Sequence, residues 1–217
     1  MNMAAPRKRK VDAERRAQIG RERKARTRAR ILAVTFDIFG HENGLYSRVE
    51  EVCAAAAITR QTFYNHFTGM EELLEALTWE VAHDFLMAVT ASLDTMPDAG
   101  QRTAAAIRYF LERGRTDARW AWSIVNLSAS GVVFGAETYD QARRTVVDGL
   151  ASGVFHLEDE RIGRDLVLGA TLSALFTQLR EATAENYPAK VAQAVLQGLG
   201  CARDEAEKFA TLPLPLL

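Results

Sequence analysis

The side chains at residues 60–66 carry the donors and acceptors that can read the edges of DNA bases. Arginine, glutamine, threonine and asparagine are the residue types that pair with base edges in a major groove. Phe63 and Phe67 recur among them at helical spacing, which predicts a short helix with an apolar back and a polar face. We expect this helix to read bases through Arg60, Gln61, Thr62 and Asn65.

A second short helix, predicted to begin at Ser47, must position the reading helix. Ser47 followed by Glu50 fits a capping box, and Thr59 is a good N-cap for the reading helix. Two short helices joined by a tight turn are typical of a helix-turn-helix motif. Further DNA contacts are expected from Ser47, Arg48, Thr59, Tyr64 and His66, with phosphate held by Ser47, Tyr64 and His66.

The span Ala29–Leu74 resembles the N-terminal DNA-binding domain of the TetR family of transcriptional regulators. The matching segments are RILAVTFDIFGHENG, SRVEEVCAAAAI, and TRQTFYNHF followed by EELLEAL. Two positions depart from the family's pattern. Ala56 or Ala57 stands in the turn where the family usually has Gly, and Met70 stands where it usually has a phosphate-binding Lys.

The helical pattern continues to the end of the body, without an alternating strand pattern of useful length. The resemblance implies an all-α fold, with an N-terminal three-helix helix-turn-helix DNA-binding domain and a C-terminal helical ligand-binding and dimerisation domain. We therefore divide the chain into a basic N-terminal arm at 1–28, the DNA-binding domain at 29–75, the C-terminal domain at 76–210 and a tail at 211–217.

Charge is divided unequally along the chain. Residues 7–30 hold twelve Lys and Arg against three acids, a net charge of +9, whereas residues 31–217 carry a net charge of −10. A cationic arm beside a reading helix indicates contact with nucleic acid; the alternative is a solvated tail. Residues 12–30 contain no Pro and can extend the first helix. The tract Arg7, Lys8, Arg9 and Lys10 could lie along a minor groove.

Two apolar stripes run along the helix predicted at 159–183, so two surfaces must cover it. One surface can be its own core; the other can be a partner subunit, unless both stripes face one core. The resemblance implies a homodimer through the last two long helices, which would match a palindromic operator. The expected interface residues are Leu166, Gly169, Ser173, Thr177, Val191, Val195 and Leu199.

Aromatic residues and two amides are spread over segments that should converge in the C-terminal domain. Small-molecule sites are mostly apolar with a few placed polar groups, so these residues predict a pocket for a small, largely apolar effector. The alternative is that they form ordinary core. The set is Phe85, Phe110, Trp120, Trp122, Asn126, Phe134, Phe176 and Gln178.

Catalytic signatures are missing from the sequence. The four histidines form no metal-binding spacing, and neither a phosphate-cradling glycine loop nor a GxSxG motif occurs. We therefore expect no enzyme activity, no cofactor and no metal. No apolar run approaches the ~20 residues that span a membrane, and the two cysteines fit a reducing cytoplasm.

The resemblance implies a prokaryotic, cytoplasmic repressor, associated with the nucleoid when it is bound to double-stranded operator DNA. A small-molecule ligand would release it from a palindromic operator. Two other classes remain as alternatives. One is a nonspecific architectural DNA-binding protein that uses only the basic arm, and the other is an α-helical enzyme.

Overall fold

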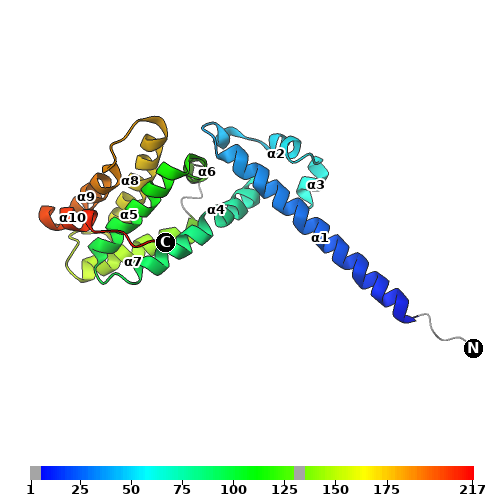
Figure 1. Ribbon diagram of the computed structural model, residues 1–217, viewed down its shortest axis with the longest axis horizontal. Helices are drawn as coiled ribbons and strands as arrows, with labels where there is room; N and C mark the ends of the chain where they lie inside the picture. Colours follow the sequence, from blue (N-terminus) through cyan, green and yellow to red (C-terminus); the bar gives the residue numbers. More distant parts are fainter. Residues whose placement is uncertain (1–5, 130–134) are drawn as a thin grey trace, which may run out of the picture.

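The computed structural model describes residues 6–129 and 135–217, which form α-helices and one 3-10 helix and contain no strand. This confirms the all-α prediction. None of the described helices is long and apolar enough to cross a membrane. The head consists of α1 (Pro6–Phe39), η1 (Gly44–Tyr46), α2 (Val49–Ala55) and α3 (Arg60–Tyr64). The body consists of α5 (Ala99–Thr116), α6 (Ala118–Ala129), α7 (Gly135–Ala151), α8 (Glu160–Arg180), α9 (Tyr187–Gly198) and α10 (Arg203–Thr211), and α4 (Met70–Leu93) joins head and body (Figure 1).

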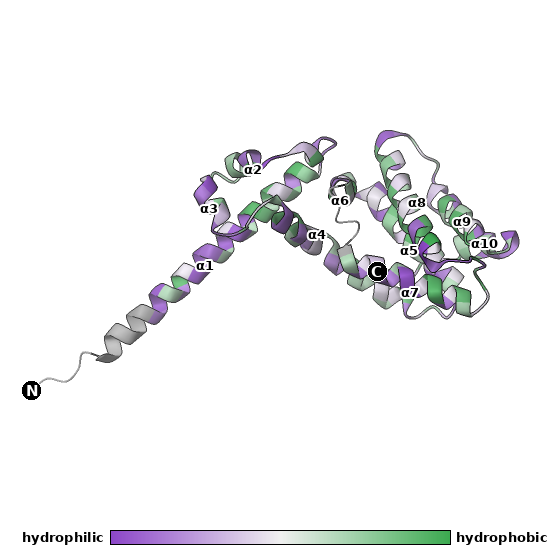
Figure 2. Ribbon diagram, turned by 180° about the vertical axis from the view of Figure 1, so that it is seen from behind, coloured by the Kyte–Doolittle hydropathy of each residue, from purple (hydrophilic) through white to green (hydrophobic). Residues whose placement is uncertain are grey.

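The first helix, α1, is continuous over 34 residues and projects beyond the rest of the molecule (Figure 1). Where Figure 2 colours the projecting part by hydropathy, it is mostly hydrophilic, and the helix becomes more apolar where it packs on the head. The prediction that residues 12–30 extend this helix is confirmed. The backbone at 7–10 belongs to the same helix, and the side chains there lie outside the described part. The placement of this tract along a minor groove therefore stays a prediction.

The head has its own apolar core, built from short helices that could not be stable alone. Ile31 and Phe39 of α1, Val52 of α2 and Phe63 of α3 are all fully or almost fully buried in it. Further buried members are Leu32, Cys53, Ala56, Phe67, Leu73, Leu74, Leu77 and Leu127. Leu127 belongs to α6, so the body contributes one side chain to the core of the head.

The body ends in a helix that the sequence analysis did not predict, α10. Ala206 and Ala210 bury its inner face against α5 and α9. The tail after it has no helical structure and lies on the body, where the Tyr109 hydroxyl donates to the carbonyl oxygen of Pro215 at 2.8 Å. Most residues of α10 are charged or small, so its apolar periodicity is too weak to stand out in the sequence.

Candidate DNA-binding surface and effector chamber

The start of α2 differs from the predicted capping box. The N-cap residue is Arg48, with no capping hydrogen bond from its side chain, and α2 begins at Val49. Ser47 instead ends the 3-10 turn, since its N–H donates to the carbonyl oxygen of Gly44 at 3.1 Å. Glu50 is therefore free to reach the reading helix, where its Oε1 lies 2.9 Å from Nη1 of Arg60. The capping-box prediction is wrong, and an exposed ion pair links the two helices in its place.

The turn between α2 and α3 is a Schellman motif. The N–H of Ile58 donates to the carbonyl oxygen of Cys53 at 3.0 Å, and that of Ala57 to Ala54 at 3.1 Å. Ala57 has a φ of 49°, in the left-handed region that favours glycine. Of the two alanines that depart from the family's glycine, Ala57 is thus the one that occupies the strained position.

Replacing Ala57 with Gly is expected to stabilise the protein by about 0.5–1 kcal/mol. The left-handed conformation costs an L-residue roughly 1–2 kcal/mol, and the greater freedom of glycine in the unfolded chain offsets part of that gain. Urea denaturation measures the change. Ala55→Gly is the matched control, because it places glycine inside α2 and should destabilise by about 0.5–1 kcal/mol. A destabilised Ala57→Gly protein would contradict the turn geometry.

The reading helix α3 begins as predicted. The Thr59 hydroxyl oxygen accepts from the N–H of Thr62 at 3.1 Å, and the two hydroxyl oxygens lie 2.9 Å apart. Arg60, Gln61 and Asn65 are exposed, with Nε2 of Gln61 3.3 Å from Oδ1 of Asn65. Three of the four expected base-reading side chains thus lie exposed on the surface, and Thr62 is half-buried beside the cap.

His66 sits at the back edge of the reading helix. Its Nδ1 is buried and has no hydrogen-bond partner among the described residues. Burial, together with the positive charges of Lys24 and Arg28, lowers the pKa of the imidazole. The lowered pKa favours the neutral imidazole, and because Nδ1 is buried, a phosphate contact by His66 would use its Nε2.

Cations of α1 lie beside this edge of the head. Lys24 and Arg28 are close enough to affect the pKa of His66, and the guanidinium of Arg28 stacks over the Phe67 ring at 4.8 Å. The sequence analysis did not single out either residue, although its charge count for residues 7–30 included both. Of the other residues expected to contact DNA, Tyr64 and Arg48 are exposed and Ser47 is half-buried. Met70 packs partly buried against the head core.

The head and body meet at a second junction besides α4. Asn126 of α6 is buried, and its Nδ2 donates to the carbonyl oxygens of Phe39 at 2.8 Å and His41 at 2.7 Å. A Cβ added at Gly44 would lie only 2.9 Å from that Nδ2, so η1 also approaches α6 closely. The amide that the sequence suggested for ligand orientation instead holds the head against the body.

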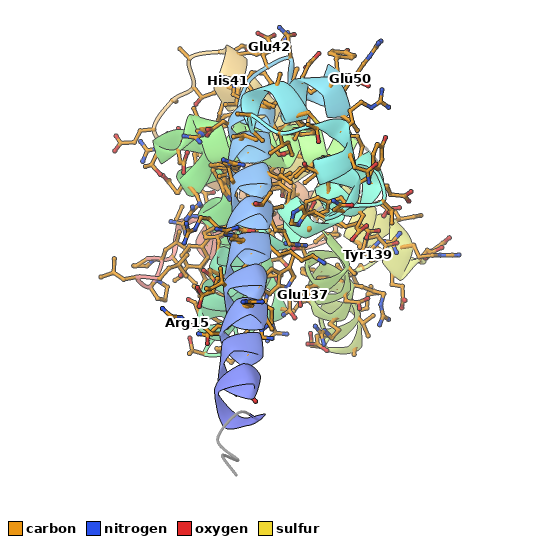
Figure 3. All side chains as sticks on the ribbon, turned by 90° about the vertical axis from the view of Figure 1, so that its right-hand side faces the viewer. Arg15, His41, Glu42, Glu50, Glu137 and Tyr139 are labelled. Carbon is orange, nitrogen blue, oxygen red and sulfur yellow. The ribbon has the colours of Figure 1, made fainter. Side chains whose placement is uncertain are left out.

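Two ion pairs flank this junction. Arg119 of α6 pairs with Asp37 and lies over the Phe36 ring at 4.7 Å, and Arg180 of α8 pairs with Glu42. Figure 3 shows Glu42 beside His41 at the end of α1 that lies opposite Arg15. Both pairs are largely exposed and so contribute little by themselves. They show, however, that α6 and α8 both touch the head.

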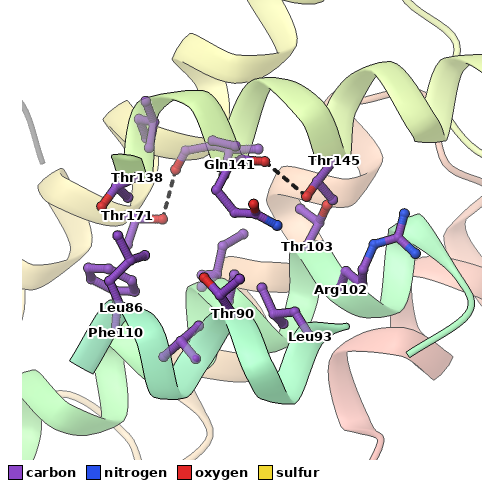
Figure 4. A pocket seen from close by; sticks show the side chains of 16 residues that line it. Leu86, Thr90, Leu93, Arg102, Thr103, Phe110, Thr138, Gln141, Thr145 and Thr171 are labelled. Carbon is purple, nitrogen blue, oxygen red and sulfur yellow. Dashed lines mark hydrogen bonds between the residues drawn. The ribbon is translucent and has the colours of Figure 1, made fainter. Parts of the chain in front are cut away.

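A small chamber of about 60 Å³ lies inside the body between α4, α5, α7 and α8 (Figure 4). Among the described residues that were predicted to bind a ligand, only Phe110 lines it. The described lining residues are Leu86, Val89, Thr90, Leu93, Arg102, Thr103, Ala106, Ile107, Phe110, Thr138, Gln141, Ala142, Thr145, Val167, Leu168 and Thr171. Hereafter we call this space the chamber.

Most of the other predicted ligand residues pack elsewhere. Phe85, Phe110 and Trp120 form a cluster with ring centroids 5.2–5.9 Å apart, as the core alternative expected. Trp122 contacts Phe176 edge-on at 6.0 Å, outside the chamber. The side-chain amide of Gln178 is buried without a hydrogen-bond partner among the described residues, and Phe134 lies outside the described residues.

One face of α8 is apolar but uncovered. Ile162 is 59% exposed and Phe176 40% exposed, with Gly169 and Ser173 exposed between them. Leu166, Thr177 and Val191 border this face and are half-buried. Val195 and Leu199, which were expected at the interface, are instead buried in the core of their own protomer. They cannot reach a partner without unfolding α9, so the outer face of α8 carries the proposed interface without them.

Comparisons with known proteins agree with this arrangement of head and body. A family profile described as "Bacterial regulatory proteins, tetR family" matches residues 31–77. A second profile, described as "Tetracyclin repressor-like, C-terminal domain", matches residues 98–211, more than half of the chain. No curated protein sequence matched the chain.

Several solved structures share the fold. RolR without ligand is 25% identical with a TM-score of 0.69, over 87% of this chain and 98% of RolR. RolR in complex with resorcinol is 24% identical with a TM-score of 0.68, over 90% of this chain and 98% of RolR. A tetR-family regulatory protein from Rhodococcus RHA1 is 20% identical with a TM-score of 0.56, over 81% of this chain and 98% of that protein. The chain therefore belongs to the TetR family, as a transcriptional regulator with an N-terminal DNA-binding domain and a C-terminal ligand-binding domain.

Proposed function

We propose that the protein is a homodimeric repressor that binds a palindromic operator through α3 and is released by a small, largely apolar effector in the chamber. The observation that carries this proposal is the course of α4. Leu73 and Leu77 in its first turns belong to the core of the head, and Leu86 and Val89 in its later turns line the chamber. A displacement of α4 at the chamber would therefore also move the head.

The size of the chamber supplies a reason for such a displacement. Its volume is about 60 Å³, whereas an engineered cavity that binds benzene has about 150 Å³. A ring-sized effector can enter only if the four lining helices move apart, and α4 is one of them. RolR, whose structure contains resorcinol, is the reason to test one-ring compounds first.

The binding of effector and the binding of operator must then be negatively coupled. An effector that binds better to the conformation without DNA weakens DNA binding, and DNA weakens effector binding by the same factor. The junction at Asn126 fixes the end of α1 to α6, so the head would follow α6 as well as α4. We place the protein in the prokaryotic cytoplasm, on the nucleoid when it is bound to DNA.

Selection of genomic DNA fragments by the purified protein, followed by sequencing, tests sequence-specific binding. We expect one enriched inverted repeat, because a two-fold symmetric dimer presents two copies of α3. An architectural protein would enrich no motif. A reporter gene placed behind the selected site should be transcribed more strongly in the absence of the protein, and the opposite result would make it an activator.

Deleting residues 1–20 is expected to weaken binding to operator and scrambled duplexes by similar factors. The deletion removes six Lys and Arg from the projecting part of α1 and leaves α3 intact. The slope of log affinity against log salt concentration should become shallower by about 0.9 for each phosphate group that the shortened protein no longer neutralises. Gel-shift titrations at several salt concentrations measure both quantities.

A control for the arm deletion changes Arg203 and Lys208 to Ala, which removes exposed cations from α10. These changes should leave affinity and salt slope unaltered. A truncated protein that binds with the original affinity and slope would show that the arm is only a solvated segment. Loss of sequence preference would instead mean that the arm reads a groove.

A further inference from the structure

The chamber is far more apolar than its residue types suggest. Six of its sixteen lining residues are Thr or Gln, yet carbon atoms supply nearly all of its exposed surface. The Thr171 hydroxyl donates to the carbonyl oxygen of Val167 at 2.7 Å, and the Thr145 hydroxyl donates to that of Gln141 at 3.0 Å. Both hydroxyl groups are thus turned toward their own helix backbone, as the dashed lines in Figure 4 show. These residues line the chamber much as valines would.

The one charged residue of the lining is already neutralised. Arg102 donates through Nη1 to the carbonyl oxygens of Met96 and Pro97, both at 3.1 Å, and through Nη2 to Asp148 at 2.9 Å. Its side chain is only 15% exposed. A charged group placed in this chamber would lose its hydration and find no free ionic partner in the lining, which is strongly unfavourable.

A polar cleft of about 400 Å³ adjoins the chamber. Thr90, Arg102, Gln141 and Thr145 line both spaces, so they form the boundary between them. The cleft also contains Asp94, Met96, Arg144 and Asp148. Together with Arg102 they give it two positive and two negative side chains. A ligand that reaches from the chamber into the cleft would pass from an apolar to a polar, electrically balanced environment.

Gln141 is the residue placed to recognise the polar end of such a ligand. Its side chain extends between α7 and α4 toward the middle of the space in Figure 4. Its Oε1 accepts from Nη2 of Arg144 at 3.1 Å, which leaves the two Nε2 protons as donors. Asn126 and Gln178, the amides first expected to orient a ligand, do not line the chamber.

We propose that the effector is an uncharged amphiphile, whose apolar body fills the chamber and whose polar end accepts a hydrogen bond from Gln141 at the edge of the cleft. The proposal rests on the chamber being the regulatory site, as proposed above. It assigns Gln141 as a specificity-determining residue, and it excludes carboxylates and amines as effectors of this site.

Isothermal titration of the full-length protein with compounds that share one six-carbon ring tests this proposal. The series is cyclohexanone, methylcyclohexane, cyclohexanecarboxylate and cyclohexylammonium. Cyclohexanone should bind tightest, methylcyclohexane several-fold more weakly because it lacks an acceptor, and the two ions more than about tenfold more weakly than cyclohexanone. Tightest binding by either ion, or no binding by cyclohexanone, would overturn the proposal.

Three variants locate the binding site. Gln141→Leu should weaken the binding of cyclohexanone about fivefold, the loss expected for one hydrogen bond. The affinity for methylcyclohexane should stay within about twofold of the original value. Thr171→Ser should weaken both compounds about threefold because a methyl group leaves the chamber wall. Thr78→Ser is the matched control, since Thr78 is equally buried and donates to Leu74 in the same way, but outside the chamber.

If the Gln141→Leu protein keeps the full preference for cyclohexanone over methylcyclohexane, Gln141 does not bind the polar end of the ligand. Equal effects of Thr171→Ser and Thr78→Ser would place the ring outside the chamber and overturn the proposal. The DNA selection needs no effector, so failure of sequence-specific binding would be recognised separately from failure of the effector chemistry.

Discussion

A folded monomer that has lost tight operator binding is the expected product of Gly169→Arg. Within the protomer, a Cβ at Gly169 would meet no atom within 4 Å, so the subunit itself does not require glycine there. Glycine inside a helix costs about 1 kcal/mol relative to alanine, and the protomer therefore offers no reason for this residue. Close approach of a second subunit supplies one, because the outer face of α8 between Ile162 and Phe176 is apolar and exposed.

An arginine at this position would prevent that approach and place a charge in an apolar interface. Without the partner, the two reading helices are no longer linked, and operator affinity should fall by about a hundredfold to ten-thousandfold. Light scattering measures the mass, and gel-shift titration measures the affinity. Glu207→Arg is the control, because it introduces the same side chain at an exposed position of α10, and this protein should remain dimeric. A Gly169→Arg protein that is still dimeric at micromolar concentration would place the interface elsewhere.

The second large effect is expected at the junction between head and body. Asn126→Asp keeps the shape of the side chain but replaces its Nδ2 donor by an oxygen, which would face the carbonyl oxygens of Phe39 and His41 at about hydrogen-bond distance. Loss of two hydrogen bonds in a buried position should cost about 2–4 kcal/mol. Urea denaturation measures the loss, and faster hydrogen exchange at the end of α1 should accompany it.

Asn186→Asp is the matched control, because Asn186 is exposed and its side chain makes no capping bond to α9. That change should alter stability by less than about 0.5 kcal/mol. We also expect the Asn126→Asp protein to respond less to the effector, because α6 no longer holds the head. An Asn126→Asp protein as stable as the original would contradict the role of this residue in joining the two parts.

The head could be predicted closely because its signals are local. The cap at Thr59 and the buried Phe63 and Phe67 depend on residues that lie within a few positions of one another, and the structure confirms them. The predicted N-cap of α2, Ser47, was wrong by one position, because the N–H of Ser47 donates to the preceding 3-10 turn. The turn was predicted only in part: the resemblance to the family identified the departure from glycine, but the backbone conformation was needed to choose Ala57 over Ala56.

The body was harder to predict because its contacts join residues that are distant in the sequence. An amide in an apolar stretch indicates that a partner exists, but Asn126 finds its partners more than eighty residues away. In the sequence, Val195 and Leu199 fit either the core of the protomer or an interface with a partner. The prediction also lacked α10, the helix that covers α9 together with α5. Threonine is a polar residue type in the sequence, whereas the hydroxyl groups of Thr145 and Thr171 donate to their own helix backbone and so leave their methyl groups to the chamber lining.

Competition between the selected operator and a scrambled duplex, at matched salt and with or without effector, tests most directly whether the protein reads DNA sequence under the control of an effector. The proposed function predicts that the operator binds about a thousandfold or more tightly than the scrambled duplex. A ring compound that binds in the chamber should reduce that preference by weakening operator binding. Equal binding of both duplexes, with no change when the effector is added, would contradict both sequence reading by α3 and its control through α4.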